Sequence, residues 1–242
     1  MSRLCFFQVI FLFFLSHSVF AEKINFITLD VEPWASYDEI SGEFVGVFPD
    51  FVREIEIRTG YEINISLSPF AFERINRELD MGRQDCKVFL LDGAKDSIIV
   101  VGSSIFDIPM GVIAKKGLSL VDRSSLKGVK VSTLKPLSEG GKFMDDDFFD
   151  KIFDANYSVG LKKLAHGRVD AVAGAIPTIM FLAKSEDMEN DVGMPLLLSY
   201  EKIFFQCSKN SKKIKAVKII SNIVEKMKEE GVLEEVVSEN NW

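Results

Sequence analysis

The sequence predicts an α/β protein built as two similar lobes. Apolar segments of strand length alternate along the chain with amphipathic segments of roughly 10 to 15 residues, a pattern typical of βαβ units and a mostly parallel sheet. An internal repeat supports two lobes: LDMGRQDCKVF (79–89) and LAHGRVDAVAG (164–174) each combine the end of a helix, the tetrad Gly-Arg-x-Asp and an apolar strand. Glycine suits a left-handed helix cap and aspartate suits the turn before a strand, so the repeat predicts the same construction twice.

The first half of the chain contains one cycle of these elements. The expected order is strand, helix, strand, helix, strand, over residues 23–32, 46–60, 62–70, 71–82 and 86–91. The second cycle is expected to contain a strand, a polar loop, an aspartate-rich helical stretch, a helix, a strand and a further helix. Its bounded elements are 126–133, 158–167 and 170–176. The extended run 196–209 is long enough to pass between the lobes, and two helices follow, 213–231 and 232–240.

The first residues have the pattern of a secretory signal peptide. One cation at Arg3 precedes an apolar run, Leu4 to Leu15, and Val19 and Ala21 occupy the small-residue positions of a cleavage site. The alternative is a membrane anchor, but about 12 apolar residues are fewer than the roughly 20 that span a bilayer. We therefore expect residues 1–21 to be removed and the mature protein to be periplasmic and untethered.

Charge and cysteine content limit the kinds of partner and cofactor that we expect for the protein. The chain has 29 Lys and Arg against 36 Asp and Glu, a formal net charge of −7 without a basic stripe, which argues against nucleic acid as a partner. Outside the leader only Cys86 and Cys207 remain, in a compartment that permits disulfides. They either form a bridge or stay as two buried thiols. His and Cys show no paired metal-ligand spacing, and we expect no cofactor.

Five segments, taken in order, carry a resemblance to a known family. They are EPWASYDEISGEFVGVFPDFVREIEIRTGYEINI (32–65), LDMGRQD (79–85), SSLKGVKVST (124–133), HGRVDAV (166–172) and KIISNIVEKMKEEGVLEEV (218–236). Their order and spacing resemble the bacterial extracellular solute-binding proteins of family 3, which have the type II periplasmic binding protein-like fold. The resemblance covers nearly the whole mature chain.

The resemblance implies a domain organisation and a function. Each lobe would be a mostly parallel sheet flanked by helices, with two crossing strands as the hinge, near 106–112 and 196–204. Residues 22–107 and 201–242 would form lobe one, and residues 108–200 would form lobe two. Such a protein captures a small molecule between its lobes and presents it to an ABC-type transporter permease or a membrane sensor. We expect a monomer that is not an enzyme.

Four residues of lobe one are candidates for contact with the solute. Trp34 and Tyr37 follow the first strand, at the carboxyl edge where parallel sheets bind ligands, and either stack on a solute or cap the core. Glu32 is either a carboxylate facing the solute or a solvated strand end. Arg74 starts the second helix and either binds a carboxylate or phosphate or pairs with a neighbouring glutamate.

Two further regions depart from the amino-acid-binding members of the family. Those members place an arginine after the third strand to bind the solute carboxylate, whereas LLDGAKDSIIVVGSS (90–104) contains no arginine. Lys95 is the only cation of this segment, and Asp92 is a candidate acidic group. In lobe two the loop TLKPLSEGGKF (133–143) supplies Ser138, but it adds Glu139, which would repel an anion.

A second aspartate in those members, five residues after the first, pairs with the solute ammonium. The same count from Asp170 reaches Ala175 in this chain. Both charged contacts are missing, so we expect a solute other than a standard α-amino acid.

Two other functions remain open. Exported relatives with this fold include cyclohexadienyl dehydratases, and Glu32, Asp92 or Glu139 would have to serve as the acid or base in such chemistry. The other alternative is a lobe pair that binds a protein and no solute.

Overall fold

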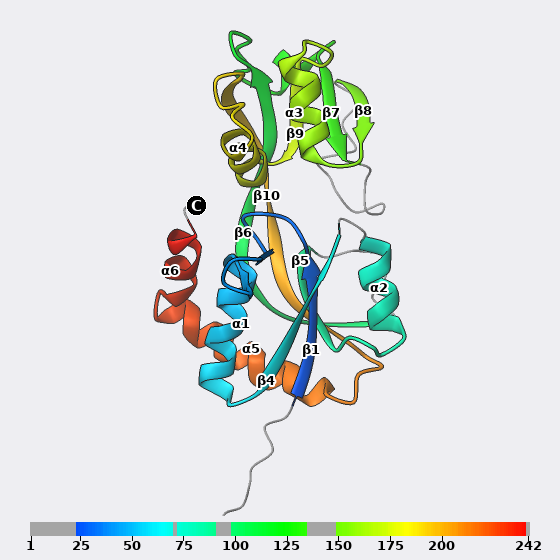
Figure 1. The fold of residues 1–242 in the computed structure, drawn as a ribbon, viewed down its shortest axis with the longest axis vertical. Helices are drawn as coiled ribbons and strands as arrows, with labels where there is room; N and C mark the ends of the chain where they lie inside the picture. Colours follow the sequence, from blue (N-terminus) through cyan, green and yellow to red (C-terminus); the bar gives the residue numbers. More distant parts are fainter. Residues whose placement is uncertain (1–22, 70–71, 91–97, 135–148, 241–242) are drawn as a thin grey trace, which may run out of the picture.

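The computed structural model describes residues 23–69, 72–90, 98–134 and 149–240. These residues form two lobes joined by two long strands (Figure 1). The predicted α/β, two-lobed fold with crossing strands is therefore confirmed. Among the described residues, no helix has the length and apolar character that crossing a bilayer requires.

Lobe one is a sheet with helices on both faces. Its strands run parallel to one another and are β1 (Lys23–Leu29), β4 (Glu62–Ser68) and β5 (Cys86–Leu90). Its helices are α1 (Val47–Thr59), α2 (Phe72–Asp80), α5 (Ile214–Glu229) and α6 (Val232–Glu239). Successive side chains of β1 point to opposite faces of the sheet. Phe26 packs with α1 and α5 on one face, whereas Ile27 packs with α2 on the other.

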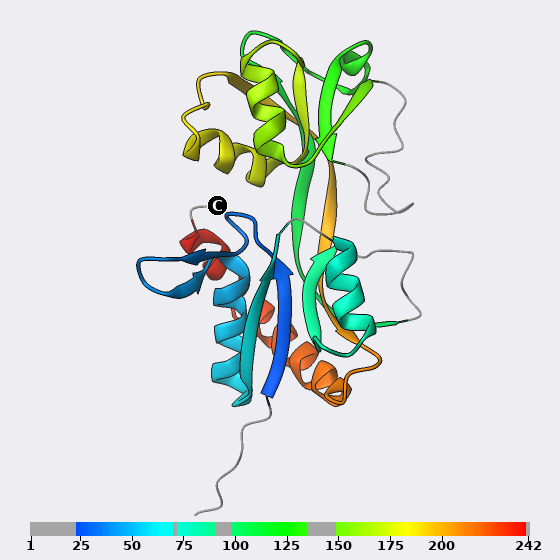
Figure 2. The same ribbon diagram turned by 45° about the vertical axis from the view of Figure 1, so that its right-hand side comes forward.

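Lobe two is a second parallel sheet, and both of its helices pack in the same core on one face of that sheet. Its parallel strands are β7 (Lys130–Leu134), β8 (Asp150–Asp154) and β9 (Ala171–Ala175). Its helices are α3 (Tyr157–Ala165) and α4 (Ile176–Ser185), with a 3₁₀ turn, Arg123–Leu126, before β7. Figures 1 and 2 show α4 on the side of lobe two that faces lobe one.

Two antiparallel strands connect the lobes. They are β6 (Ile99–Lys115) and β10 (Val192–Ser208), each 17 residues long. In lobe one β10 pairs with β5, and in lobe two β6 pairs with β9. The result is one eight-stranded sheet in the order β4-β1-β5-β10-β6-β9-β7-β8. The crossings expected near 106–112 and 196–204 fall inside these two strands.

The Gly-Arg-x-Asp repeat has the same structure in both lobes. Gly82 and Gly167 end their helices with φ of 63° and 67°, the left-handed region that favours glycine. The Asp85 carboxylate accepts a hydrogen bond from the backbone N–H of Asn25 at 2.9 Å. The Asp170 carboxylate accepts one from the N–H of Lys130 at 3.2 Å. In each lobe the aspartate therefore holds the start of the neighbouring parallel strand.

Two local features differ from the sequence-based expectation. The aspartate-rich stretch was expected to be helical, but its described end, Asp150–Asp154, is strand β8. Asp154 there accepts hydrogen bonds from Ser132 at 2.6 Å and from Lys163 of α3, so its charge is compensated inside a sheet. A hairpin of two three-residue strands, β2 (Ser36–Asp38) and β3 (Glu43–Val45), was not expected at all.

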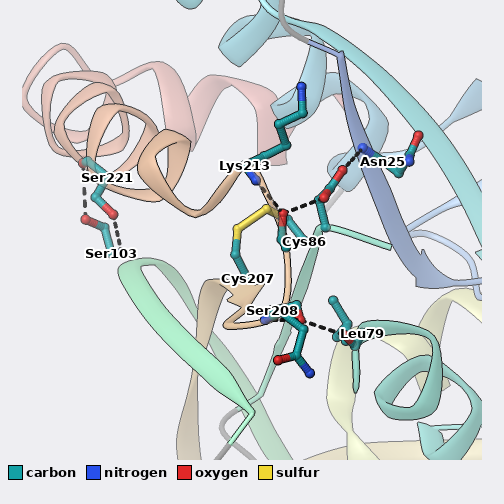
Figure 3. The surroundings of a disulfide bond; sticks show 11 residues. Asn25, Leu79, Cys86, Ser103, Cys207, Ser208, Lys213 and Ser221 are labelled. Carbon is teal, nitrogen blue, oxygen red and sulfur yellow. Dashed lines mark hydrogen bonds between the residues drawn. A yellow bond between two sulfur atoms is a disulfide. The ribbon is translucent and has the colours of Figure 1, made fainter. Parts of the chain in front are cut away.

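A disulfide joins Cys86 of β5 to Cys207 of β10, which face each other in the antiparallel register. The sequence alone allows either this bridge or two free thiols. Both cysteines are buried, and the surrounding hydrogen bonds tie several elements of lobe one together (Figure 3). The Ser208 hydroxyl donates to the carbonyl of Leu79 in α2. Ser103 of β6 is hydrogen-bonded to Ser221 of α5 through both its backbone N–H and its hydroxyl.

We expect the disulfide to contribute strongly to stability, because its cysteines are separated by 121 residues and the bridge restricts the unfolded chain. The Cys86→Ala/Cys207→Ala variant should lose about 2–4 kcal/mol of unfolding free energy in urea titrations. Wild type unfolded under reducing conditions should match the variant. Equal stability of the variant and oxidised wild type, together with two free thiols in unreduced wild type, would contradict the assignment.

Asp170 should make the stability of lobe two depend on pH. The hydrogen bond from Lys115, at 2.7 Å, and that from the Lys130 N–H hold the pKa of Asp170 below its ordinary value. The contribution of this carboxylate is therefore complete above the ordinary aspartate pKa, and it is lost as the pH falls through the lower folded pKa.

Asp170→Asn should lower the unfolding free energy at neutral pH by about 1 kcal/mol, because the ion pair is partly exposed. Urea titrations from about pH 6 down to about pH 2 should show the two proteins converging in stability. A difference that stays constant over this range would contradict the role assigned to the charge.

Candidate functional site

The loop after β1 brings Trp34 to the junction between the lobes. Its indole Nε1–H donates a hydrogen bond to the hydroxyl of Thr178 at 2.6 Å. Thr178 is the third residue of α4 in lobe two, so this bond crosses from one lobe to the other. Only 4% of Trp34 and 2% of Thr178 are exposed, so the contact excludes water.

The backbone of this loop is held by lobe one. The N–H groups of Trp34 and Ala35 both donate to the Val31 carbonyl, closing a tight turn. The first N–H groups of α1, those of Val47 and Phe48, donate to the carbonyls of Pro33 and Trp34 at 3.2 and 2.8 Å. No side chain caps α1, so the loop satisfies donors that a helix start otherwise leaves unpaired.

Gly46 permits this close approach. It lies just before α1 with φ of 115°, and a Cβ there would lie 2.8 Å from the Pro33 carbonyl oxygen and 2.9 Å from that of Trp34. Any larger residue would therefore push the loop away from the helix start.

Three aromatic rings form the lobe-one side of the junction. The Trp34 ring stacks on Phe48 of α1 and on Phe106 of β6, with ring centroids 5.6 Å apart in both cases. Phe48 and Phe106 are 6.1 Å apart, so each ring contacts the other two. Phe106 belongs to a crossing strand, and the cluster therefore connects α1, the Trp34 loop and the hinge.

On the lobe-two side of the junction, the described residues Ala175 and Tyr157 carry no charge. Ala175 ends β9, and its N–H donates to the Tyr157 hydroxyl at 3.2 Å. Burial raises the pKa of Tyr157 to about 12, so this hydroxyl stays neutral at physiological pH. The Tyr157 ring lies directly over Gly174, where an added Cβ would come within 2.2 Å of the hydroxyl oxygen. The position where amino-acid binders carry an aspartate is thus packed against a neutral phenol.

The other predicted lobe-one residues do not join this cluster. Tyr37 lies in the β2–β3 hairpin, which stands out from the side of lobe one in dark blue (Figure 2). The residue is 51% exposed, and its ring meets Phe44 edge to face. Glu32 is exposed in the loop after β1, and Arg74 is exposed in α2. The predicted candidates Asp92, Lys95, Ser138 and Glu139 lie outside the described residues.

Three residues of the junction were missed by reasoning from sequence. In the sequence, Phe48 is one of several apolar residues of an amphipathic helix, and Phe106 lies at the edge of a predicted crossing strand. Neither pattern indicates a place in the junction. Thr178 carries the only usable signal, because it is a hydroxyl within the apolar run AVAGAIPTIMF, where a buried donor or acceptor needs a partner. Among the described residues, no group of three His, Cys, Asp or Glu side chains gathers in a way that could hold a metal ion.

No known protein-family profile matches the chain, and no curated protein matches it by sequence. Several solved structures are similar in fold. The periplasmic VFT2 domain of Bordetella pertussis BvgS has a TM-score of 0.73 at 14% identity, over 90% of this chain and 92% of that one. A mutant of ArgBP from T. maritima has a TM-score of 0.69 at 18% identity, over 90% and 94%. A histidine kinase sensor domain with similarity to periplasmic binding proteins has a TM-score of 0.72 at 15% identity, over 90% and 95%.

These and other similar structures are solute-binding or sensor domains of the periplasmic-binding-protein type. At such identities the likeness establishes the fold, which is the two-lobed type II periplasmic-binding-protein fold.

Gly46 provides a direct test of how the Trp34 loop is held. Gly46→Ala should cost about 2 kcal/mol or more of unfolding free energy, because it combines positive φ with contacts shorter than 3 Å to the loop carbonyls. It should also change the near-ultraviolet circular dichroism of the indole. Gly60→Ala is the matched control, with φ of 70° and no atom within 4 Å of its added Cβ, and it should cost about 1 kcal/mol without the spectral change. Indistinguishable stabilities and spectra of the two variants would contradict this account.

Proposed function

We propose that this chain is an exported solute-binding protein, a divergent member of the extracellular solute-binding family 3. It captures a small molecule between lobe one (22–107 and 201–242) and lobe two (108–200) and presents it to an ABC-type transporter or a membrane sensor. The observation that carries the proposal is the pair of long crossing strands, β6 and β10, which joins two sheet-and-helix lobes in one continuous sheet. The similar solved structures with solute-binding or sensor names support it.

We further propose that the solute is not a standard α-amino acid. Some similar structures are named for amino acids, including one in complex with L-glutamate, but at 16% identity that likeness extends to fold alone. In this chain Ala175 stands where an ammonium-binding aspartate would be needed, and its N–H is already bonded to Tyr157. The sequence from 90 to 104 contains no arginine that could bind a carboxylate in two-pronged geometry.

The proposal includes export, a monomeric state and the absence of catalysis. Export is supported by the sequence pattern of residues 1–21. A binding role is favoured over an enzymatic one because the described junction residues are apolar or neutral. Tyr157 titrates far from physiological pH and makes a poor general base. The acidic candidates Asp92 and Glu139 lie outside the described residues, and Glu32 is exposed in its loop.

The test begins with freshly purified mature protein. Native mass spectrometry, followed by identification of released small molecules, should find a bound solute that is not one of the twenty amino acids. A protein that carries no small molecule from cells or periplasmic extract would favour a protein-binding role instead.

Ligand-stripped protein should then bind all twenty amino acids weakly or not at all in isothermal titration. A zwitterion in a closed site needs both charges paired, and the loss of both contacts should weaken binding by about two to four decades. Micromolar binding of any amino acid would show that the recognition charges had moved elsewhere, and would return the solute class to amino acids.

A further inference from the structure

We propose that the contact between Trp34 and Thr178 holds the two lobes together without any solute, so that the resting protein is closed. The inference goes beyond solute binding, because it concerns the solute-free protein and holds whether or not a solute is found.

Each partner of the contact is fixed within its own lobe. The Trp34 loop is bonded through its carbonyls to the start of α1, and the indole packs against Phe48 of the same helix. Thr178 lies in the first turn of α4, whose next residue, Ile179, is fully buried in the core of lobe two. Neither side chain can follow the other if the lobes move apart. The 2.6 Å hydrogen bond therefore reports lobe separation directly.

Apolar packing accompanies the hydrogen bond. Phe106 and Met110 of β6, together with Ala175 at the end of β9, pack against the core of lobe one. Ala175 belongs to lobe two, so the apolar surface of lobe one continues across the junction. Separation of the lobes would expose the indole and part of this surface to water, which opposes opening. The protein supplies these interactions entirely from its own side chains.

The lobes would therefore close without a contribution from the solute. In a protein whose solute supplies the closing contacts, the solute-free form would instead be open. The indole is 4% exposed in the closed arrangement, so a solute reaches this ring only after the lobes part. A ligand shifts a two-state equilibrium only through its differential affinity for the two states. A solute that contacts Trp34 would therefore favour the separated form, and the closed form would be the default.

The exchange rate of the Trp34 indole N–H measures this equilibrium in solute-free protein. The protein is stripped by unfolding and refolding with its disulfide intact, and ¹⁵N-resolved hydrogen exchange is recorded, with Trp242→Phe assigning the Trp34 signal. We expect strong protection in the wild type. Thr178→Val removes the acceptor with little change of shape and should lower protection about two- to tenfold. Thr178→Ser keeps a hydroxyl acceptor and should stay within about twofold of wild type.

A distance measurement identifies the closed state independently. Spin labels at Ile57→Cys on α1 and Lys184→Cys on α4, both exposed, report the separation of the lobes in the mature protein, because the two cysteines outside the leader are joined in the disulfide. Solute-free wild type should give one short distance. Trp34→Ala should add a longer one, and Trp34→Phe serves if the alanine variant does not fold.

Three outcomes would overturn the proposal. They are an unprotected Trp34 indole in the solute-free wild type, a long distance already present at rest, and protection unchanged by Thr178→Val.

Discussion

The antiparallel pairing of β6 with β10 is the constraint on which the rest of the structure depends. Both strands run for 17 residues, and each serves as a sheet strand in both lobes. Their approach is tight at the hinge, where a Cβ on Gly111 would lie 2.2 Å from the Leu196 carbonyl oxygen. In lobe one the Cys86–Cys207 disulfide fastens β10 to β5. The two lobes are therefore joined through β6 and β10, and in our proposal the side chains at the junction set their resting position.

In each lobe the same glycine and aspartate arrangement connects a helix to the next parallel strand. A helix ends at a left-handed glycine, the chain turns, and an aspartate accepts a hydrogen bond from an N–H group near the start of the adjacent strand. The surroundings of the two aspartates differ. Asp85 also accepts a hydrogen bond from the buried Ser211 before α5, whereas Asp170 pairs with Lys115 at the lobe-two end of β6. The same device thus anchors a C-terminal helix in one lobe and a crossing strand in the other.

The fold could be predicted from sequence because its signals are local. Gly60, Gly82, Gly167 and Gly231 all adopt positive φ at helix ends, and apolar alternation marks the strands between them. Strand β8 escaped prediction because it has an aspartate at each end, and the charge of Asp154 is compensated by Lys163 from another element. The partner of Trp34 could not be predicted, because Thr178 lies 144 residues away and their contact exists only when the lobes meet. The tertiary arrangement creates the described part of the site.

The chemistry of the junction and the closure of the lobes follow from one feature, the pairing of its polar groups within the protein. The indole N–H is bonded to Thr178, the Ala175 N–H to Tyr157, and the first N–H groups of α1 to loop carbonyls. A charged solute placed here would lose its hydration, while the Ala175 N–H and the first N–H groups of α1 stay bonded within their own lobes, which is unfavourable in a buried site. The internal hydrogen bonds at the junction thus also disfavour the binding of a zwitterion. Any charge that a solute carries has to be recognised away from the Trp34 cluster.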